Sequence, residues 1–391
     1  MNSELNLLIG LANIGNTCFF NAVLQALRLS PPIGSMFLTE RPIALREKSQ
    51  RTQLVLAFQR LMQDLWKESP PAGVKSTMIP RGFFQSLFNV LNETNDGWYH
   101  KGQQADAAEA IQYILESLHD GIYKSVTMSV SGESSNCEEV SQIKAIESWA
   151  TYFSKEYSPI IQNFYGQTQI RIQCDKCKSL SERYEPWLMI KAPIPGGDVV
   201  GGPAPTLDTC LKAAFESESL DDYECTTCSL REGHKVNGKA TITNQISRLP
   251  PVVILSIKRF TNDGNKVRGK LAWDLDSFDL GSVFAFSRNP FSDNPIHTQY
   301  ETFAVIEHHG SLQGGHYTMY ARQNETWLEY DDNSITDVTP DRVVSADSYI
   351  LFLLPKADKE KMNGQFAESI KALRRRAQSK SNNGGESAVE A

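Results

Sequence analysis

Apolar residues recur at the spacing of an amphipathic helix in three segments of the N-terminal third of the chain. These segments are 19–27, 53–66 and 107–118. Residues i, i+4 and i+8 share one face of a helix, as Phe19, Val23 and Leu27 do in the first segment. The pattern therefore predicts three helices before about Tyr123, each with one buried face.

The pattern changes near Phe164, where alternating and continuous apolar runs replace the helical spacing. Ile170 and Ile172 alternate with polar residues, as expected of a half-buried strand. The run 252–257 is almost entirely apolar and predicts a central strand that is buried on both faces. Further strands are expected at 241–243, 302–307, 317–322, 327–330 and 349–354.

Three segments lack such periodicity. Residues 125–137 are rich in Ser, Thr and Gly and predict a surface loop, and the Gly- and Pro-rich stretch 193–205 predicts a loop that interrupts the strands. Residues 357–391 are charged and polar and predict a disordered tail, with one short segment of helical pattern at 366–375. The basic run Arg374 to Arg376 is either a localisation or anion-binding patch or, as we favour, a solvated charge run.

Composition narrows the class of protein. At 391 residues the chain exceeds the usual size of a single core, so we expect one large domain or two to three subdomains. The net charge of −7 argues against a nucleic-acid-binding protein, and no apolar run has the length of a membrane span. The first residues lack the pattern of a secretory signal. Seven cysteines without such a signal suit an intracellular location, in the cytoplasm and/or nucleus.

Four of these cysteines form two Cys-x-x-Cys pairs, Cys174 with Cys177 and Cys225 with Cys228. Four thiolates complete a closed tetrahedral zinc site that leaves no position for water, which indicates a structural ion. Because 47 residues separate the pairs, we expect the fold to bring them together at the tips of strand pairs. The alternative is two unrelated pairs or redox motifs; the sequence favours zinc.

A fifth cysteine, Cys18, stands where a loop containing glycine and asparagine meets the first predicted helix. The first amides of a helix have no intrahelical partner, and the helix dipole favours an anion there. The thiolate is the nucleophilic form of cysteine, so this position suits a catalytic cysteine. The alternative is a buried structural cysteine at a helix start, and the segment alone does not separate the two.

A cysteine nucleophile needs a base, and His316 is the candidate because it follows two glycines at the start of a predicted strand. A structural histidine is the alternative. The next predicted strand ends at Asp331, and an antiparallel pair would bring this carboxylate beside His316 to orient the imidazole. Asp331 also belongs to an Asp-Asp-Asn sequence that is ordinary in turns.

From Leu11 to Leu354 the chain resembles the catalytic domain of the ubiquitin-specific proteases. The resemblance rests on the two cysteine pairs and on boxes in the family's order at 10–21 (GLANIGNTCFFN), 104–109 (QADAAE), 255–260 (LSIKRF), 300–317 (ending in GGHY) and 327–332 (WLEYDD). It implies an α+β, papain-like fold with a helical thumb, a β-rich palm and zinc-tipped fingers. The implied ranges are 1–9 (extension), 10–163 (thumb), 164–250 (fingers), 251–355 with parts of 164–195 (palm) and 356–391 (tail).

The resemblance also implies roles for individual residues. Cys18 matches the nucleophile, His316 the base, Asp331 the third member of the triad and Asn13 the side chain that stabilises the oxyanion. It implies substrate contacts by Gln104, Asp106, His308, Gly314, Gly315, Tyr317 and Asp332. Asp106 has a further possible role, because Asp106-x-x-Glu109 is also a capping box for the third predicted helix. One structural Zn²⁺ would bind Cys174, Cys177, Cys225 and Cys228.

The expected function is that of a thiol protease which hydrolyses the peptide or isopeptide bond after the C-terminal glycine of ubiquitin. Its partners would be ubiquitin and ubiquitinated proteins, with no nucleic acid and no membrane, and we expect a monomer that a regulatory partner could bind. Two alternatives stay open: an idle ubiquitin-binding adaptor, and a protease for another ubiquitin-like modifier. The long segment 262–298 departs from the family and suggests a blocking loop or a partner surface.

Overall fold

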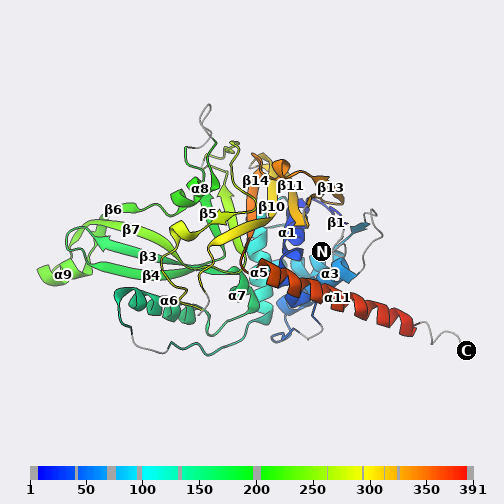
Figure 1. Ribbon diagram of the computed structural model, residues 1–391, viewed down its shortest axis with the longest axis horizontal. Coiled ribbons are helices and arrows are strands. Elements are labelled where there is room, and N and C mark those ends of the chain that lie inside the picture. Colours follow the sequence, from blue (N-terminus) through cyan, green and yellow to red (C-terminus); the bar gives the residue numbers. More distant parts are fainter. Residues whose placement is uncertain are drawn as a thin grey trace, which may run out of the picture.

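The computed structural model describes residues 8–39, 43–67, 76–94, 99–130, 134–196, 204–261, 263–292, 295–311, 313–323 and 326–384 (Figure 1). Parts of the loops predicted at 125–137, 193–205 and 262–298, and the ends of the extension and of the tail, lie outside these residues. No helix within the described ranges is long and apolar enough to cross a membrane.

Helices dominate the N-terminal third of the fold. They are α1 (Cys18–Arg28), α2 (Pro31–Phe37), α3 (Gln50–Lys67), α4 (Arg81–Thr94), α5 (Ala107–Ile122), α6 (Cys137–Phe153) and α7 (Pro159–Phe164), followed later by α8 (Leu207–Ala214), α9 (Thr226–Glu232), α10 (Pro340–Val343) and α11 (Lys359–Gly384). The three helices predicted from apolar spacing are confirmed as α1, α3 and α5. Phe19, Val23 and Leu27 are fully buried, so the predicted face of α1 is the one that packs.

The strands form one large sheet, one smaller sheet and a short parallel pair. Their bounds are β1 (Ile9–Leu11), β2 (Ser76–Met78), β3 (Gly166–Cys174), β4 (Leu180–Trp187), β5 (Met189–Pro193), β6 (Glu218–Glu224), β7 (Asn237–Arg248), β8 (Val253–Lys258), β9 (Phe278–Asp279), β10 (Gln299–Ser311), β11 (Gly314–Gln323), β12 (Thr326–Asp331), β13 (Ser334–Val338) and β14 (Ser348–Pro355). The large sheet has the order β13-β12-β11-β10-β14-β8-β5, with β9 beside β10, and the smaller one has the order β4-β3-β7-β6. Every segment predicted as a strand lies in one of these elements, except that β8 begins one residue after the start of the predicted run 252–257.

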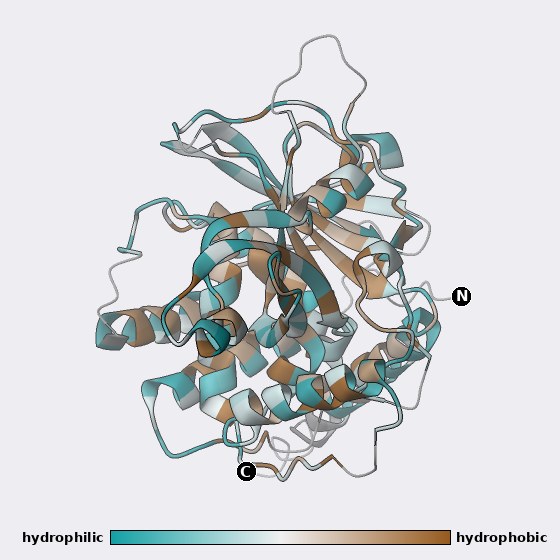
Figure 2. Cartoon of the chain, turned by 90° about the vertical axis from the view of Figure 1, so that its left-hand side faces the viewer, coloured by the Kyte–Doolittle hydropathy of each residue, from teal (hydrophilic) through white to brown (hydrophobic). Residues whose placement is uncertain are grey.

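The large sheet separates two hydrophobic cores. Ile254 of β8 belongs to the core shared with the N-terminal helices, whereas its neighbours Val253 and Leu255 belong to the core beneath α8. Residues on both faces of β8 are therefore buried, which confirms the prediction of a central strand. Figure 2 shows these strands largely in brown at the centre of the molecule.

The smaller sheet extends away from α1, α3 and α5, with α6 alongside β4 and α9 at its tip (Figure 1). Much of the segment 263–292 packs into the second core, where Leu271, Leu275, Phe278, Leu280 and Val283 are buried. The fold thus combines a helical part, a central sheet and a projecting sheet. The boundaries predicted for thumb, palm and fingers stay a prediction.

The prediction of a disordered tail is wrong for residues 359–384, which form α11. Phe366, Ile370 and Leu373 recur at a helical spacing and are buried. The Phe366 ring packs edge-on at 5.0 Å from Trp66 of α3. This stripe supplies enough apolar contact to order a helix that is otherwise charged, which composition alone does not reveal. Residues 385–391 lie outside the described residues.

Candidate active site

Cys18 is the first residue of α1, as predicted, and its side chain is buried. The loop before it is held by the side-chain oxygen of Asn13, which accepts hydrogen bonds from the amides of Gly15 and Thr17 at 3.1 Å each. Gly15 has φ 117° and Asn16 has φ 54°, so the loop turns through left-handed backbone that suits these residue types. The turn therefore fixes Asn13 close to the start of the helix.

His316 and Asp331 come together as predicted, because β11 and β12 form an antiparallel hairpin. Nε2 of His316 lies 2.6 Å from Oδ1 of Asp331. A hydrogen bond with Cys18 is the largest cause of a raised pKa of His316, to about 9; the bond to Asp331 also raises it, while burial opposes both. The imidazole of His316 thus lies between a thiol and a carboxylate, and both partners favour its charged form.

Asp332 follows in the β12–β13 turn, with φ 49°. Its two carboxylate oxygens accept from the side-chain amides of two residues, Asn13 at 3.0 Å and Asn21 at 2.7 Å. Its backbone carbonyl accepts the Leu11 amide at 2.8 Å. Asp332 therefore joins the loop before Cys18 to the hairpin that carries Asp331. Asn21 was not among the predicted site residues, although it stands in the same sequence box as Cys18.

A cavity of about 140 Å³ lies between the start of α5 and the turn joining β10 to β11. Its lining includes six of the predicted substrate contacts: Gln104, Asp106, His308, Gly314, Gly315 and Tyr317. A Cβ atom on Gly315 would lie 2.3 Å from Nε2 of His308, so the close approach requires glycine. The amide of Gly315 donates to Oε1 of Gln104 at 2.8 Å, so Gln104 holds this turn as well as lining the cavity.

Asp106 uses one oxygen as the N-cap of α5, accepting from the Ala108 amide at 2.6 Å. Asp106 is therefore the N-cap of α5, which is the part of the predicted capping box that the structure confirms. Its other oxygen accepts the Tyr349 hydroxyl at 2.5 Å, so the carboxylate is already held on two sides. A contact between Asp106 and a substrate stays a prediction.

His308 is a buried histidine between aromatic rings, with its ring 4.6 Å from that of Tyr317. Burial is the main cause that lowers the pKa of His308 to about 4, helped by the nearby charge of Lys266. The imidazole is therefore neutral near pH 7 and packs mainly as an aromatic wall of the cavity.

The two cysteine pairs meet at the tip of the projecting sheet, as predicted. Cys174 ends β3, and Cys225 precedes α9 between β6 and β7. The sulfur atoms of Cys174 and Cys228 lie 3.9 Å apart, and those of Cys177 and Cys225 lie 3.5 Å apart. Four thiolates about 2.3 Å from a tetrahedral ion would be separated by roughly 3.8 Å, so the group fits zinc. All four side chains are free cysteines in the structure.

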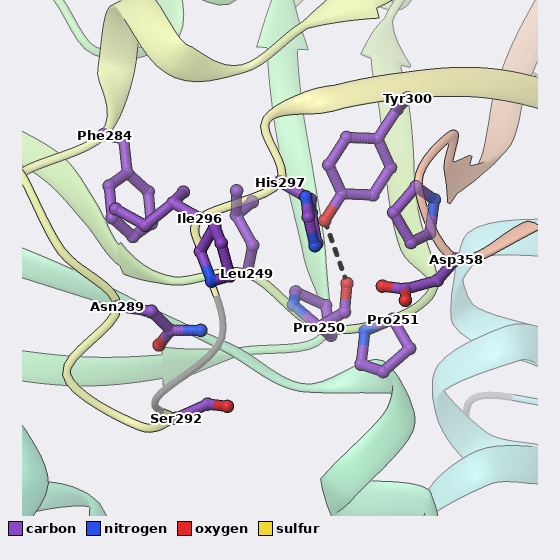
Figure 3. A pocket seen from close by; sticks show the side chains of 12 residues that line it. Leu249, Pro250, Pro251, Phe284, Asn289, Ser292, Ile296, His297, Tyr300 and Asp358 are labelled. Carbon is purple, nitrogen blue, oxygen red and sulfur yellow. Dashed lines mark hydrogen bonds between the residues drawn. The ribbon is translucent and has the colours of Figure 1, made fainter.

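A second cavity, of about 160 Å³, contains none of these residues (Figure 3). It is lined mainly by prolines and aromatic rings, and the Tyr300 hydroxyl donates to the carbonyl of Pro250 at 3.2 Å. It holds no cysteine, and its acid, Asp358, belongs to the segment after β14. The thiol, imidazole and carboxylate at Cys18 therefore make the better candidate for chemistry.

A family model described as ubiquitin carboxyl-terminal hydrolase matches residues 9–353. The chain belongs to this family. The match spans every predicted site residue of this ubiquitin carboxyl-terminal hydrolase domain and ends before α11 begins at Lys359.

Curated relatives of the domain carry the same family name. Human ubiquitin carboxyl-terminal hydrolase 2 is 28% identical over 352 residues, which cover 88% of this chain and 54% of that protein. Human ubiquitin carboxyl-terminal hydrolase 3 is 28% identical over 386 residues, covering 90% of this chain and 69% of that protein. The ubiquitin carboxyl-terminal hydrolase Usp2 of Drosophila melanogaster is 27% identical over 351 residues, which cover 88% of this chain and 34% of that protein. The chain thus spans about half the length of the first curated relatives it matches.

Solved structures with the same fold include the SAGA Ubp8/Sgf11/Sus1/Sgf73 DUB module bound to ubiquitin aldehyde. The likeness has a TM-score of 0.63 at 19% identity and covers 90% of this chain and 70% of that chain. The corresponding module bound to monoubiquitin gives a TM-score of 0.64 at 19% identity, with the same coverage. Together with the mixed helices and sheets described above, this likeness confirms the predicted fold class.

Proposed function

We propose that this ubiquitin carboxyl-terminal hydrolase domain is a deubiquitinating thiol protease. Its substrate would be the peptide or isopeptide bond that follows the C-terminal glycine of ubiquitin. The observation that carries the proposal is that His316 is hydrogen-bonded to both Cys18 and Asp331, in a chain that belongs to this family. The names of the curated relatives and the ubiquitin-bound structures of the same fold support ubiquitin as the partner.

In the first half of the reaction, His316 takes the proton of Cys18, and the thiolate attacks the carbonyl carbon of the scissile bond. Asp331 holds the imidazole and stabilises its charged form. The oxyanion would be met by the Cys18 amide, which as a helix-start donor has no intrahelical partner, and by the side-chain amide of Asn13. Asp332 accepts one N–H of that amide and so orients the other.

Collapse of the tetrahedral species breaks the C–N bond, and His316 gives its proton to the leaving amine. The acyl group then remains on Cys18 as a thioester. A water molecule deprotonated by His316 attacks this thioester, releasing the carboxylic acid and restoring the thiol. The cavity beside Gly315 suits a substrate tail without side chains, because its walls already approach one another closely.

We further propose that Cys174, Cys177, Cys225 and Cys228 hold one structural zinc ion. The ion would fasten the tip of the projecting sheet and take no part in bond cleavage, since four thiolates leave no open position. The hydroxyl of Ser179 lies 3.0 Å from the sulfur of Cys177 and 3.4 Å from that of Cys225, and it lowers the pKa of both thiols. This second layer of contacts favours the thiolates that a metal requires.

A ubiquitin molecule with an electrophile at its C-terminus tests the proposal directly. It should bond covalently to the wild-type chain and leave Cys18→Ala unmodified, while Cys137→Ala, which removes an exposed cysteine, should still react. Binding without reaction by the wild-type chain would instead identify an idle adaptor. Faster reaction with the same probe built on another ubiquitin-like modifier would identify a different substrate. We expect an intracellular monomer, which light scattering and localisation of the tagged chain would check.

A further inference from the structure

A group of polar side chains lies behind the turn that joins β10 to β11, outside the set used by the proposed reaction. It consists of Lys266, Glu307, His309, Thr318 and Asp347, and is called the polar clasp below. Asp347 is its hub: Oδ1 accepts from Nζ of Lys266 at 2.6 Å, and Oδ2 lies 3.2 Å from Nδ1 of His309. The Lys266 side chain is only 3% exposed and that of Asp347 is 29% exposed, so the lysine end of this ion pair is withdrawn from solvent.

The His309 ring connects this hub to the sheet. With Nδ1 donating to Asp347, Nε2 can accept from the Thr318 hydroxyl, which lies 3.3 Å away. Glu307 approaches the same nitrogen at 3.4 Å. Glu307 and Thr318 face each other across β10 and β11 and are both buried. The ring therefore joins both strands to the loop that precedes β14.

The clasp also fixes the backbone at the end of β10. The amide of His308 donates to the carbonyl of Asp347 at 3.0 Å, and the carbonyl of His308 accepts from Lys266. Two residues further, the carbonyl of Gly310 accepts from Nη2 of Arg268 at 3.3 Å. His309 thus stands between two carbonyls that are each held by a cation from the segment after β8.

This anchoring bears on the active site because of the strand register. His309 lies directly opposite His316, and Gly310 lies opposite Gly315. A Cβ atom on Gly315 would lie 2.4 Å from the carbonyl oxygen of His309, so the backbone of His309 forms part of the wall against which the turn packs. A shift of His309 would therefore be passed to Gly315 and His316.

We infer that His309 is a positioning residue: by bridging Asp347 and Thr318 it sets the place of Gly315 and His316 for substrate. The inference rests on the proposed function for its kinetic consequence. Among the described residues, the His309 side chain contacts Asp347, Thr318 and Glu307 and does not line the cavity beside Gly315, so we expect it to act through the backbone of β10 and β11. Displacements on the order of 1 Å in such a support can cost about 100-fold in rate, so a partial loss is measurable.

The test compares His309→Ala with His309→Asn on a fluorogenic ubiquitin C-terminal substrate. His309→Ala removes both ring contacts and should lower kcat/KM at least about tenfold, with a rise in KM from the displaced Gly315. The asparagine amide reproduces the Nδ1 donor toward Asp347 and should recover most of the loss. His119→Ala is the matched control, because it removes the buried contact between His119 and Ser158 (2.8 Å) at the end of α5. It should lower the unfolding midpoint without changing kcat/KM.

Hydrogen exchange of the backbone amides separates this inference from the proposed function. The amide of Gly315, which donates to Gln104, should exchange faster in His309→Ala than in the wild-type chain, and His309→Asn should restore its protection. The inference would be overturned if, in His309→Ala, the Gly315 amide exchanged as in the wild-type chain and kcat/KM stayed within about twofold of the wild-type value. So would a loss of activity that only follows the unfolded fraction. If the wild-type chain cleaves no ubiquitin substrate, the proposed function fails, and the exchange of the Gly315 amide alone then tests the role of His309. If His309→Ala does not fold, Thr318→Val removes the Nε2 contact and must show the same two effects.

Discussion

The side-chain amide of Asn13 donates a hydrogen bond to Oδ2 of Asp332 at 3.0 Å, across 319 positions of sequence. Because one N–H of the Asn13 amide is bonded to Asp332, the direction of its second N–H is fixed. It also links the loop before Cys18 to the hairpin that ends in Asp331. The proposed oxyanion donor, Asn13, and the proposed triad carboxylate, Asp331, are therefore held by one turn.

The first prediction concerns this pair. Asn13→Ala should lower kcat about 100-fold with little change in KM, because the lost hydrogen bond forms only in the transition state. Asp332→Ala should have a smaller effect, since it removes the partner that orients the Asn13 amide, together with the bond from Asn21. The losses in the double variant should be less than multiplicative, because both changes remove the same Asn13–Asp332 bond, and steady-state kinetics of all three variants would show it. Multiplicative losses would mean that the two residues act separately.

The second prediction concerns pH. Because hydrogen bonds with Cys18 and Asp331 raise the pKa of His316 to about 9, the imidazolium should persist through neutral pH. The raised pKa stabilises the folded chain fully below the ordinary value of 6.5, and this contribution is lost as the pH rises through about 9. The value of kcat/KM should fall over the same alkaline range as the imidazolium is lost. Asp331→Asn should move that alkaline limb to lower pH, and a limb that stays in place would contradict the assignment of His316.

The parts of the site that sequence predicts are the local ones. Cys18 could be placed at a helix start because the apolar spacing of α1 is set within a few turns. His316 and Asp331 are 15 positions apart on one hairpin, so strand pairing alone brings them together. The cysteine pairs were visible because each is a short motif, and only their meeting depended on the fold.

The parts that sequence does not predict depend on distant partners. Gln104 accepts the amide of Gly315 across 211 positions, so its structural role could not be inferred from the box around it. Lys266 and Asp347 are 81 positions apart, and nothing in either local segment marks an ion pair. The prediction of a disordered tail fails because the charge of this segment hides a narrow apolar stripe whose partner, Trp66, lies in α3.

The third prediction tests the metal. Elemental analysis should find one zinc ion per chain, and Cys228→Ser should lose it together with several degrees of the unfolding midpoint, because the metal supplies folding free energy. Cys137→Ser is the control, since Cys137 is exposed and lies outside the cluster. Chelator should lower the midpoint of the wild-type chain and of this control alike. Clearly less than one zinc ion per wild-type chain would defeat the assignment.

The fourth prediction concerns α11, which follows the family domain and packs on its helices. Phe366→Ala should lower the free energy of unfolding by about 3 kcal/mol, because the buried ring leaves a cavity against Trp66. Gly34→Ala should weaken the same contact from the other side, as its added Cβ would lie 1.9 Å from the Phe366 ring. Glu368→Ala changes an exposed position of the same helix and should stay within about 0.5 kcal/mol of wild type. Urea unfolding of the three variants measures these differences. If Phe366→Ala proved no more destabilising than Glu368→Ala, α11 would not be docked on the domain in solution.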